Sequence, residues 1–409
     1  MTAKDRSARK LEELFNAVEL PQRGPVRLAI AIPGAALLKI PGFPRAARPV
    51  PGRMASGRGF TATGARTSAL REAAELVSCS AWGDEQLVSA RDEEIGPAVL
   101  SPEVLNGFTA AQLGDRIAWN ERHRSFDWRP PRRDPATPID WLAVEDAYGG
   151  PAAYVPADFA FIGRKETGDE SAVAIGDSNG CACGADIESA RHAALLELIE
   201  SDASTRWWYG RRRRPLIDLA LLDDASGLVT WLGERERDTW LFDITSDLGV
   251  PVAAAASSEP DGSDVALGFA ARPDMREAGA AALTEMVQME FSLATVRALG
   301  PTASWAAWRQ AVTMALPPLD AAHAVKHSPA TKNKALWPGA PLEACARADV
   351  ALWFADMTRD VVGVPAVRAI SPDLCHFKPR FARKRLLAPD HPDLSPVLPN
   401  PEDQVTLLV

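Results

Sequence analysis

Three stretches of the sequence repeat one spacing of oxygen-bearing side chains. Each fits the pattern A-L-x-E-x-x-[E/Q], at residues 69–75, 194–200 and 282–288. On a helix, positions i and i+3 lie on one face, so each stretch presents two carboxylate or amide groups together. These groups, with Ser68 one turn before the first of them, belong to Glu72, Glu75, Glu197, Glu200, Glu285 and Gln288. Clustered carboxylates without nitrogen or sulfur ligands favour Mg²⁺, which commonly bridges to phosphates.

The apolar neighbours distinguish the three stretches. Around Glu72 and Glu75 the apolar residues lie on the opposite side of the helix, which is also typical of an ordinary solvated acidic face. The helices that carry Glu197 and Glu285 are apolar nearly all round, which predicts that they are buried. Buried carboxylates need a cation or hydrogen bonds, and no Lys or Arg lies at the matching position of either helix. A bound divalent ion is the simplest explanation.

Two glycine-rich segments precede the first two of these helices. They are Ser56-Gly57-Arg58-Gly59 and the stretch 178–184, which begins Ser-Asn-Gly. Backbone N–H groups near a helix N-terminus bind anions, so we expect both segments to hold phosphates. Neither is a Walker A loop or a dinucleotide fingerprint, and each alone would be an ordinary turn. Their place ahead of the carboxylate helices is what favours phosphate binding.

The elements that must position these residues mix helices and strands throughout, which predicts an α+β architecture. We expect a Pro- and Gly-rich loop over 41–64. We expect helices at about 5–19, 66–82, 187–209, 275–299 and 341–358. We expect strands at about 26–32, 153–162, 172–175, 239–244, 250–257 and 364–370.

Composition excludes several classes of protein. A net charge of −9 and a pI near 5.3 argue against a nucleic-acid binder, which needs a broad basic surface. The N-terminus lacks the apolar core of a signal peptide, and the most apolar stretch, 28–43, is interrupted by Pro33, Lys39 and Pro41. We therefore expect a cytoplasmic protein that does not bind membranes. Five cysteines, an odd and sparse count, fit reduced thiols rather than disulfides.

At these motifs the sequence resembles the YcaO superfamily, from about Gly57 to Pro401. The family's Gly-Lys-Gly segment corresponds to Gly57-Arg58-Gly59, and its S-N-G-x-A-x-G stretch begins at Ser178. The family's acidic helices correspond, in chain order, to Ser68, Glu72 and Glu75, then to Glu197, Glu200 and Asp202, then to Glu285 and Gln288. The resemblance implies mixed sheets and helices with an ATP and Mg²⁺ site between them. It divides the chain into an N-terminal segment (1–50), a YcaO-type catalytic domain (51–401) and a C-terminal tail (402–409).

The resemblance also implies an activity and roles for residues. The family members that form azolines use ATP and Mg²⁺ to phosphorylate a backbone amide oxygen of a ribosomal precursor peptide, which yields thiazoline or oxazoline rings. The implied metal ligands are Glu72, Glu75, Glu197 and Glu200. The implied nucleotide-binding residues are Arg58, Ser68, Ser178, Asn179 and Glu285, and we also expect Arg206 to bind the nucleotide as a compensating cation. The implied catalytic residues are Glu197, Glu200 and Gln288.

The chain departs from the family pattern mainly in its cations. Leu76 and Ser201 stand where an Arg follows each E-x-x-E pair, Arg58 replaces a Lys, and Glu290 replaces a common Arg. We expect other cations to compensate, the candidates being Arg58, Arg191, Arg206 and the run 211–214, which otherwise reads as a solvated surface. The azoline-forming members often end in Pro-x-Pro-x-Pro, of which only Pro399-Asn400-Pro401 is present, with eight residues after it.

Partners follow from the same resemblance. Since the chain has about the length of the YcaO part alone, we expect a hetero-oligomer with an E1-like protein that binds the leader of the precursor peptide. A flavin-dependent dehydrogenase would oxidise the azolines. Two alternatives stay open. One is the same ATP chemistry with another nucleophile, which gives a thioamide or amidine; the other is a scaffold subunit without turnover. His376 is a candidate proton shuttle or a structural residue.

Overall fold

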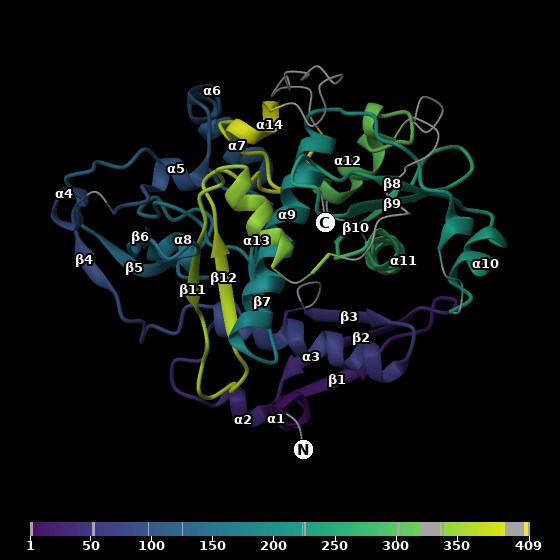
Figure 1. Cartoon of the computed structure of the whole chain (residues 1–409), viewed down its shortest axis with the longest axis horizontal. Helices are drawn as coiled ribbons and strands as arrows, with labels where there is room; N and C mark the ends of the chain where they lie inside the picture. Colours follow the sequence, from purple (N-terminus) through teal and green to yellow (C-terminus); the bar gives the residue numbers. More distant parts are fainter. Residues whose placement is uncertain are drawn as a thin grey trace.

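The chain folds into antiparallel sheets that surround one long central helix (Figure 1). The computed structural model describes residues 3–50, 54–96, 98–124, 126–222, 224, 226–300, 303–319, 336–337, 339–388 and 405–407. Within these residues the strands form three sheets, and all strand pairs between named strands are antiparallel. The predicted α+β class is confirmed.

The first sheet has the order β1-β2-β3, from Phe15–Glu19, Arg27–Pro33 and Ala55–Gly59. Helix α3 (Ala62–Cys79) packs against its strands β2 and β3. Ala65, Ala69, Ala73 and Val77 recur at helical spacing on the buried side of α3, so the helix holds itself to the sheet through one apolar face. This sheet joins residues before and after position 50, because β2 pairs with β3.

The second sheet has the order β10-β9-β8, from Ala266–Ala271, Val252–Ser258 and Asp238–Asp243. Helix α11 (Met275–Leu299) packs on β9 and β10. Each residue of β9 and β10 is buried, because α11 packs on these strands and α9 (Ile187–Trp208) also contacts both. A strand covered on both faces needs a continuous apolar run rather than an alternating one.

The third sheet has the order β4-β5-β11-β12-β7, and β6 also pairs with β5. Its strands are β4 Val88–Ala90, β5 Ile139–Asp146, β6 Ala153–Pro156, β7 Cys181–Cys183, β11 Trp353–Asp356 and β12 Ala366–Ile370. Helix α9 contacts β7 and β12 of this sheet as well as β9 and β10 of the second. Its position between two sheets explains why it is buried, as its apolar surroundings predict.

Shorter helices complete the described fold. They are α1 Ala3–Leu14, α2 Ala35–Leu38, α4 Asp92–Ile95, α5 Pro102–Asn106, α6 Ala110–Gly114, α7 Arg116–His123, α8 Ala157–Ala160, α10 Leu228–Gly233, α12 Ala303–Ala311, α13 Ala340–Arg347 and α14 Lys384–Leu387, with 3₁₀ turns at Leu219–Leu221 and Pro317–Leu319. None of the described helices is both long enough and apolar enough to cross a membrane.

Several expected elements differ from the observed ones. The first expected helix ends at Leu14, and residues 15–19 pair with β2 instead. The helix expected over 341–358 splits into α13 and β11. The expected strand 172–175 is not a strand, and the expected strand 153–162 ends at Pro156, where α8 follows. The pairing of β1 with β2, and of β11 with β5 and β12, shows tertiary contacts that override local propensity.

The C-terminal tail is described only at residues 405–407. Leu407 is fully buried, its N–H donates to the Tyr209 hydroxyl (3.0 Å), and the Trp208 indole donates to the carbonyl of Val405 (2.7 Å). The tail therefore packs at the C-terminal end of α9. The Pro399-Asn400-Pro401 segment lies outside the described residues.

Candidate active site

The helices α3, α9 and α11 bring their acidic side chains together. Glu72 and Glu75 come from α3, Glu197 and Glu200 from α9, and Glu285 from α11. The charge of Glu72 raises the pKa of Glu75 and of Glu197, and the charge of Glu285 raises the pKa of Glu72 and of Glu200. Carboxylates from all three helices therefore lie within electrostatic reach of one another, as the repeated pattern predicts.

Backbone donors hold the two carboxylates of α9. The N–H of Gly180 donates to Glu197 Oε1 (3.1 Å), and the N–H of Ala271, at the end of β10, donates to Glu200 Oε2 (2.9 Å). One donor is the last residue of the Ser-Asn-Gly turn, directly before β7, and the other is the last residue of β10. The second and third sheets thus both contribute to the orientation of this pair.

The side chains on α11 contact strand β3. Arg58 donates through Nη2 to Glu285 Oε2 (2.9 Å) and through Nη1 to Gln288 Oε1 (3.2 Å), while Gln288 Nε2 donates to Ser56 Oγ (2.7 Å). Ser56 and Arg58 alternate with Gly57 and Gly59, so their side chains share the face of β3 that meets α11. A cation for Glu285 therefore does exist, but it comes from another element and could not be found on the helix itself.

The expected phosphate-binding loop at 56–59 is a strand. A Cβ on Gly57 would lie 2.1 Å from the backbone nitrogen of Ala69 and 2.4 Å from the carbonyl oxygen of Ala65, both on α3. Gly268 of β10 shows the same close approach to α11, 2.3 Å from the carbonyl oxygen of Ala282. These glycines let the carboxylate helices lie directly on their sheets, which is a different role from the anion-binding turn that the sequence suggests.

Burial is the largest cause of the raised carboxyl pKa values. It raises the pKa of Glu75 and of Glu197 well above the ordinary value of 4.5, and that of Glu200 to about 7. Glu72 remains open to water, yet the protein atoms around it raise its pKa by desolvation, against the opposing charge of Arg58. Desolvation disfavours the ionised form of these carboxylates, and a bound cation would offset that cost.

A divalent metal fits these buried carboxylates. The cations that act on these carboxylates are Arg58 and Arg272. No three His, Cys, Asp or Glu side chains form a ready metal cluster among the residues that the structure describes. Mg²⁺ usually takes one or two protein carboxylates and completes its shell with phosphates and water. The side chains therefore suit a metal that arrives with a nucleotide better than a metal held by protein alone.

The turn at 177–180 is built around Asp177. Its carboxylate accepts from the N–H of Asn179 (3.2 Å), pairs with Lys378 (3.0 Å) and accepts from Nε2 of His376 (3.3 Å). Burial raises the pKa of Asp177, but the charge of Lys378 and the hydrogen bond from His376 outweigh burial and hold this pKa well below its usual range. Asn179 is buried and accepts from the Ser201 hydroxyl (2.7 Å), while Ser178 is exposed. These contacts therefore hold the turn against the protein interior, and Ser178 stays accessible to solvent.

His376 is a structural residue in this arrangement. Its Nδ1 accepts from the N–H of Lys378 (3.0 Å), so Nε2 carries the proton and faces Asp177. Burial lowers the pKa of His376 to about 4, although the charge of Asp177 opposes this. A neutral ring that anchors the turn fits these contacts better than a proton shuttle, which works best with a pKa near the operating pH.

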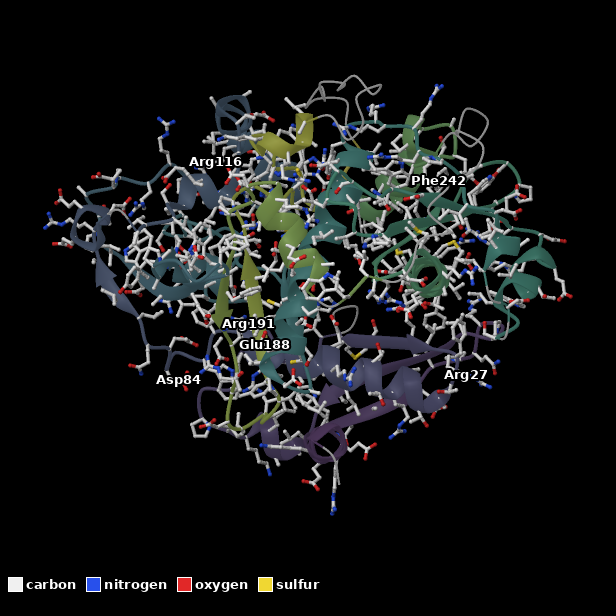
Figure 2. The ribbon with its side chains drawn as sticks, in the orientation of Figure 1. Arg27, Asp84, Arg116, Glu188, Arg191 and Phe242 are labelled. Carbon is white, nitrogen blue, oxygen red and sulfur yellow. The ribbon has the colours of Figure 1, made fainter. Side chains whose placement is uncertain are left out.

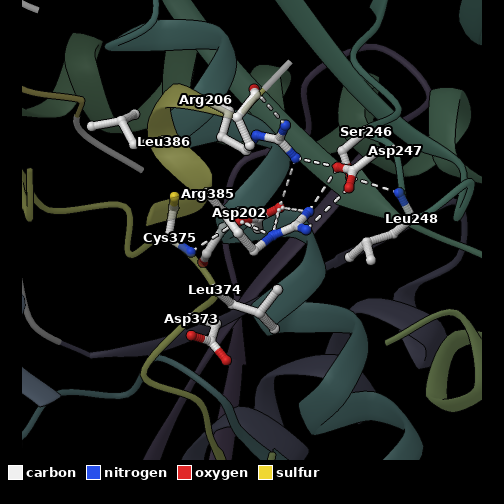
Figure 3. Close-up of polar contacts among 12 residues, drawn as sticks. Asp202, Arg206, Ser246, Asp247, Leu248, Asp373, Leu374, Cys375, Arg385 and Leu386 are labelled. Atoms are coloured by element: carbon white, nitrogen blue, oxygen red, sulfur yellow. Dashed lines mark hydrogen bonds and ion pairs between the residues drawn. The ribbon is translucent and has the colours of Figure 1, made fainter. Parts of the chain in front are cut away.

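Arg206, which was predicted to bind the nucleotide, lies in a buried network of ion pairs. Its side chain is fully buried, pairs with Asp202 (3.4 Å) and Asp247, and donates to the carbonyl of Ala388 (3.0 Å). Arg385 joins the same two carboxylates (Figure 3). A phosphate would have to displace these partners from a buried network, so Arg206 stabilises the fold.

The other expected cations are also committed to protein partners. Arg191 lies beside Glu188 on α9 (Figure 2), with 3.6 Å between them, and it also pairs with Glu145. Arg212 and Arg214, expected on a solvated surface, are buried, and Arg212 donates to the carbonyl of Ala388 (2.6 Å). Ser68 lies half-buried on α3, one turn before Glu72.

Comparison with known proteins agrees with this site. A family model described as YcaO cyclodehydratase, ATP- and Mg²⁺-binding, matches residues 56–375. The chain therefore belongs to the YcaO family.

Solved structures agree with the assignment. A heterocyclase in complex with substrate and cofactor is 26% identical, with a TM-score of 0.81 over 94% of this chain and 54% of its own. The heterocyclase TruD is 26% identical, with a TM-score of 0.71 over 98% of this chain and 57% of its own. YcaO from Methanopyrus kandleri, bound with AMPPCP and Mg²⁺, shares the fold at 18% identity, with a TM-score of 0.64 over 97% and 96% of the two chains. The chain spans little more than half the length of the two heterocyclases.

Proposed function

We propose that this chain is the ATP-dependent cyclodehydratase subunit that converts Cys, Ser or Thr residues of a ribosomal precursor peptide into thiazoline or oxazoline rings. The observation that carries the proposal is the meeting of Glu72, Glu75, Glu197 and Glu200 from two helices, where burial raises the pKa of each carboxyl group. Membership of the YcaO family supports the choice of Mg²⁺ and ATP to supply a cation and the phosphates.

The proposed chemistry starts with the side chain of the peptide, which adds to the preceding amide carbonyl. When bound, MgATP supplies the phosphoryl group that turns the former amide oxygen, a very poor leaving group, into phosphate, a good one. Loss of that phosphate leaves the C=N bond of the azoline. Positioning and charge neutralisation, rather than covalent catalysis, are what a protein contributes to phosphoryl transfer.

The residues of this chain take distinct parts in that proposal. Glu72, Glu75, Glu197 and Glu200 are the proposed metal ligands. Glu197 and Glu200, oriented by the N–H groups of Gly180 and Ala271, act with Gln288 in the catalytic step. Ser68, Ser178, Asn179, Glu285 and Arg58 are the proposed nucleotide-binding residues. Because Arg58 of β3 donates to both Glu285 and Gln288, it also holds α11 against β3.

We also propose that the chain works in a cytoplasmic hetero-oligomer. Its partners would be an E1-like protein that binds the leader of the precursor peptide and a flavin-dependent dehydrogenase that oxidises azolines to azoles. The support is the family assignment and the heterocyclase whose structure contains substrate.

The test combines the purified chain, its partner protein and the precursor peptide with MgATP. We expect ATP consumption and the loss of one water per ring by mass spectrometry. Glu197→Ala should abolish both while the protein stays folded. Glu188→Ala is the matched control, since Glu188 is an exposed carboxylate on the same helix. Ring formation by the Glu197 variant, or without nucleotide, would refute the proposal. A mass change that shows sulfur in place of a backbone amide oxygen of the peptide would indicate the thioamide reaction instead.

A further inference from the structure

In the family pattern an Arg follows each E-x-x-E pair. This chain has Leu76 and Ser201 at these two positions. The nearby candidates to replace that charge are occupied. Arg58 is bound to Glu285 and Gln288, Arg191 to Glu145 and Glu188, and Arg206 to Asp202 and Asp247. Besides Arg58, whose guanidinium is shared with Glu285 and Gln288, a further cation for the phosphates would come from a position that the family motifs do not mark.

Arg272 lies at such a position. It follows the last residue of β10 and precedes α11, so it stands between the strand that orients Glu200 and the helix that carries Glu285. Its neighbour Ala271 donates its N–H to Glu200 Oε2 (2.9 Å), and the Arg272 guanidinium donates through Nη1 to the carbonyl of the same Ala271 (2.7 Å). The side chain is thus folded back toward the residue that contacts Glu200.

The surroundings of Arg272 leave its guanidinium open to a ligand. Among the residues that the structure describes, no carboxylate lies within ion-pair distance of its guanidinium. Arg272 is also only partly buried, so a ligand can reach it. It combines proximity to a metal-site carboxylate with a guanidinium that still has donors to offer.

We propose that Arg272 is a phosphate-binding residue of the nucleotide site and replaces the cation that relatives carry within their E-x-x-E-R motifs. This inference rests on the proposed function and deepens it. The β10–α11 connection is a suitable support, because Asp274 caps α11 through the N–H of Arg276 (2.7 Å) and the N–H of Arg272 donates to the carbonyl of Pro251 (3.1 Å). A guanidinium on a fixed connection can meet phosphate oxygens with little loss of entropy.

The experiment measures MgATP dissociation constants by calorimetry for the wild type, Arg272→Ala, Arg272→Lys and Arg276→Ala, at low and high salt. Arg276 is the matched control, because it is an exposed Arg in the first turn of α11. We expect Arg272→Ala to weaken binding about tenfold, or ~1.4 kcal/mol, and to reduce its salt dependence, because one screened charge contact is lost. Arg272→Lys should recover part of the affinity, and Arg276→Ala should bind as the wild type does.

Three results would overturn the inference. One is unchanged affinity in Arg272→Ala. Another is weaker binding that keeps the wild-type salt dependence and is not recovered by Lys, which would indicate a structural role. The third is a wild-type protein that does not bind MgATP, which would also overturn the proposed function; the first two results leave that function standing.

Discussion

Replacing Glu200 by Gln should stabilise the metal-free protein above neutral pH. Burial, with the charge of Glu285, raises the pKa of Glu200 from 4.5 to about 7 in the folded state. Between these two values the folded protein keeps a proton that the unfolded chain releases, so stability falls as the pH rises through this window. Gln has nearly the same shape, still accepts the N–H of Ala271, and never ionises.

The size of the effect follows from the shift. A difference of about 2.5 pKa units at ~1.36 kcal/mol each gives an upper limit of about 3 kcal/mol at pH 8. For a chain of this length that corresponds to a rise in Tm of roughly 3–4 °C. Below about pH 4.5 both forms of Glu200 are protonated, so the variant and the wild type should melt together there.

The assay is thermal unfolding in EDTA from pH 4 to pH 8, for the wild type, Glu200→Gln and the exposed control Glu188→Gln. We expect the gain in Tm for Glu200→Gln to appear as the pH rises from about 4.5 to about 7, and no gain for the control. A Glu200→Gln protein that is less stable than the wild type at pH 8, or shifted equally at every pH, would refute the reasoning. In that case the carboxylate would already be balanced by protein groups.

Three further predictions concern the site and its supports. Binding of MgATP at pH 6 should release protons from Glu75, Glu197 and Glu200, because their pKa values are raised in the free protein. Calorimetry in buffers with different heats of ionisation measures this release. Binding without proton release would contradict the proposed metal ligands. Asp202→Asn should cost about 3–5 kcal/mol in urea unfolding, because Arg206 and Arg385 lose a fully buried carboxylate; a neutral effect would contradict the structural role of this network. Gly57→Ala should lower the free energy of unfolding by more than about 2 kcal/mol, because its Cβ would clash with the α3 backbone. Gly114→Ala should lower it little, because a Cβ there meets nothing within 4 Å. Equal effects of the two substitutions would contradict the close packing of β3 on α3.

The sequence indicated that the carboxylates of α3, α9 and α11 would meet, because the signals for this are local. Helical spacing places two side chains on one face, and the apolar surroundings of Glu197 predict a buried α9, as observed. The strand β10 was missed, although its continuous apolar run Ala266–Ala271 is a usable signal for a strand covered on both faces.

The cationic half was predicted poorly because its contacts join distant parts of the chain. Arg58 and Glu285 are 227 residues apart, and His376 and Asp177 are 199 apart. Arg206 was expected to replace a missing cation, but it shares Asp202 and Asp247 with Arg385 of α14, and Asp247 lies in the connection between β8 and β9. Which face of a strand meets which helix, as for Ser56 and Arg58 on β3, is decided by tertiary packing that no local pattern records.

The most direct measurement is anomalous diffraction from crystals grown with Mn²⁺ and a non-hydrolysable ATP analogue. The account predicts anomalous peaks among α3, α9 and α11, in coordination contact with carboxylates from the set Glu72, Glu75, Glu197 and Glu200 and with the phosphates of the analogue. Metal bound elsewhere, or an analogue bound without metal near these carboxylates, would contradict it.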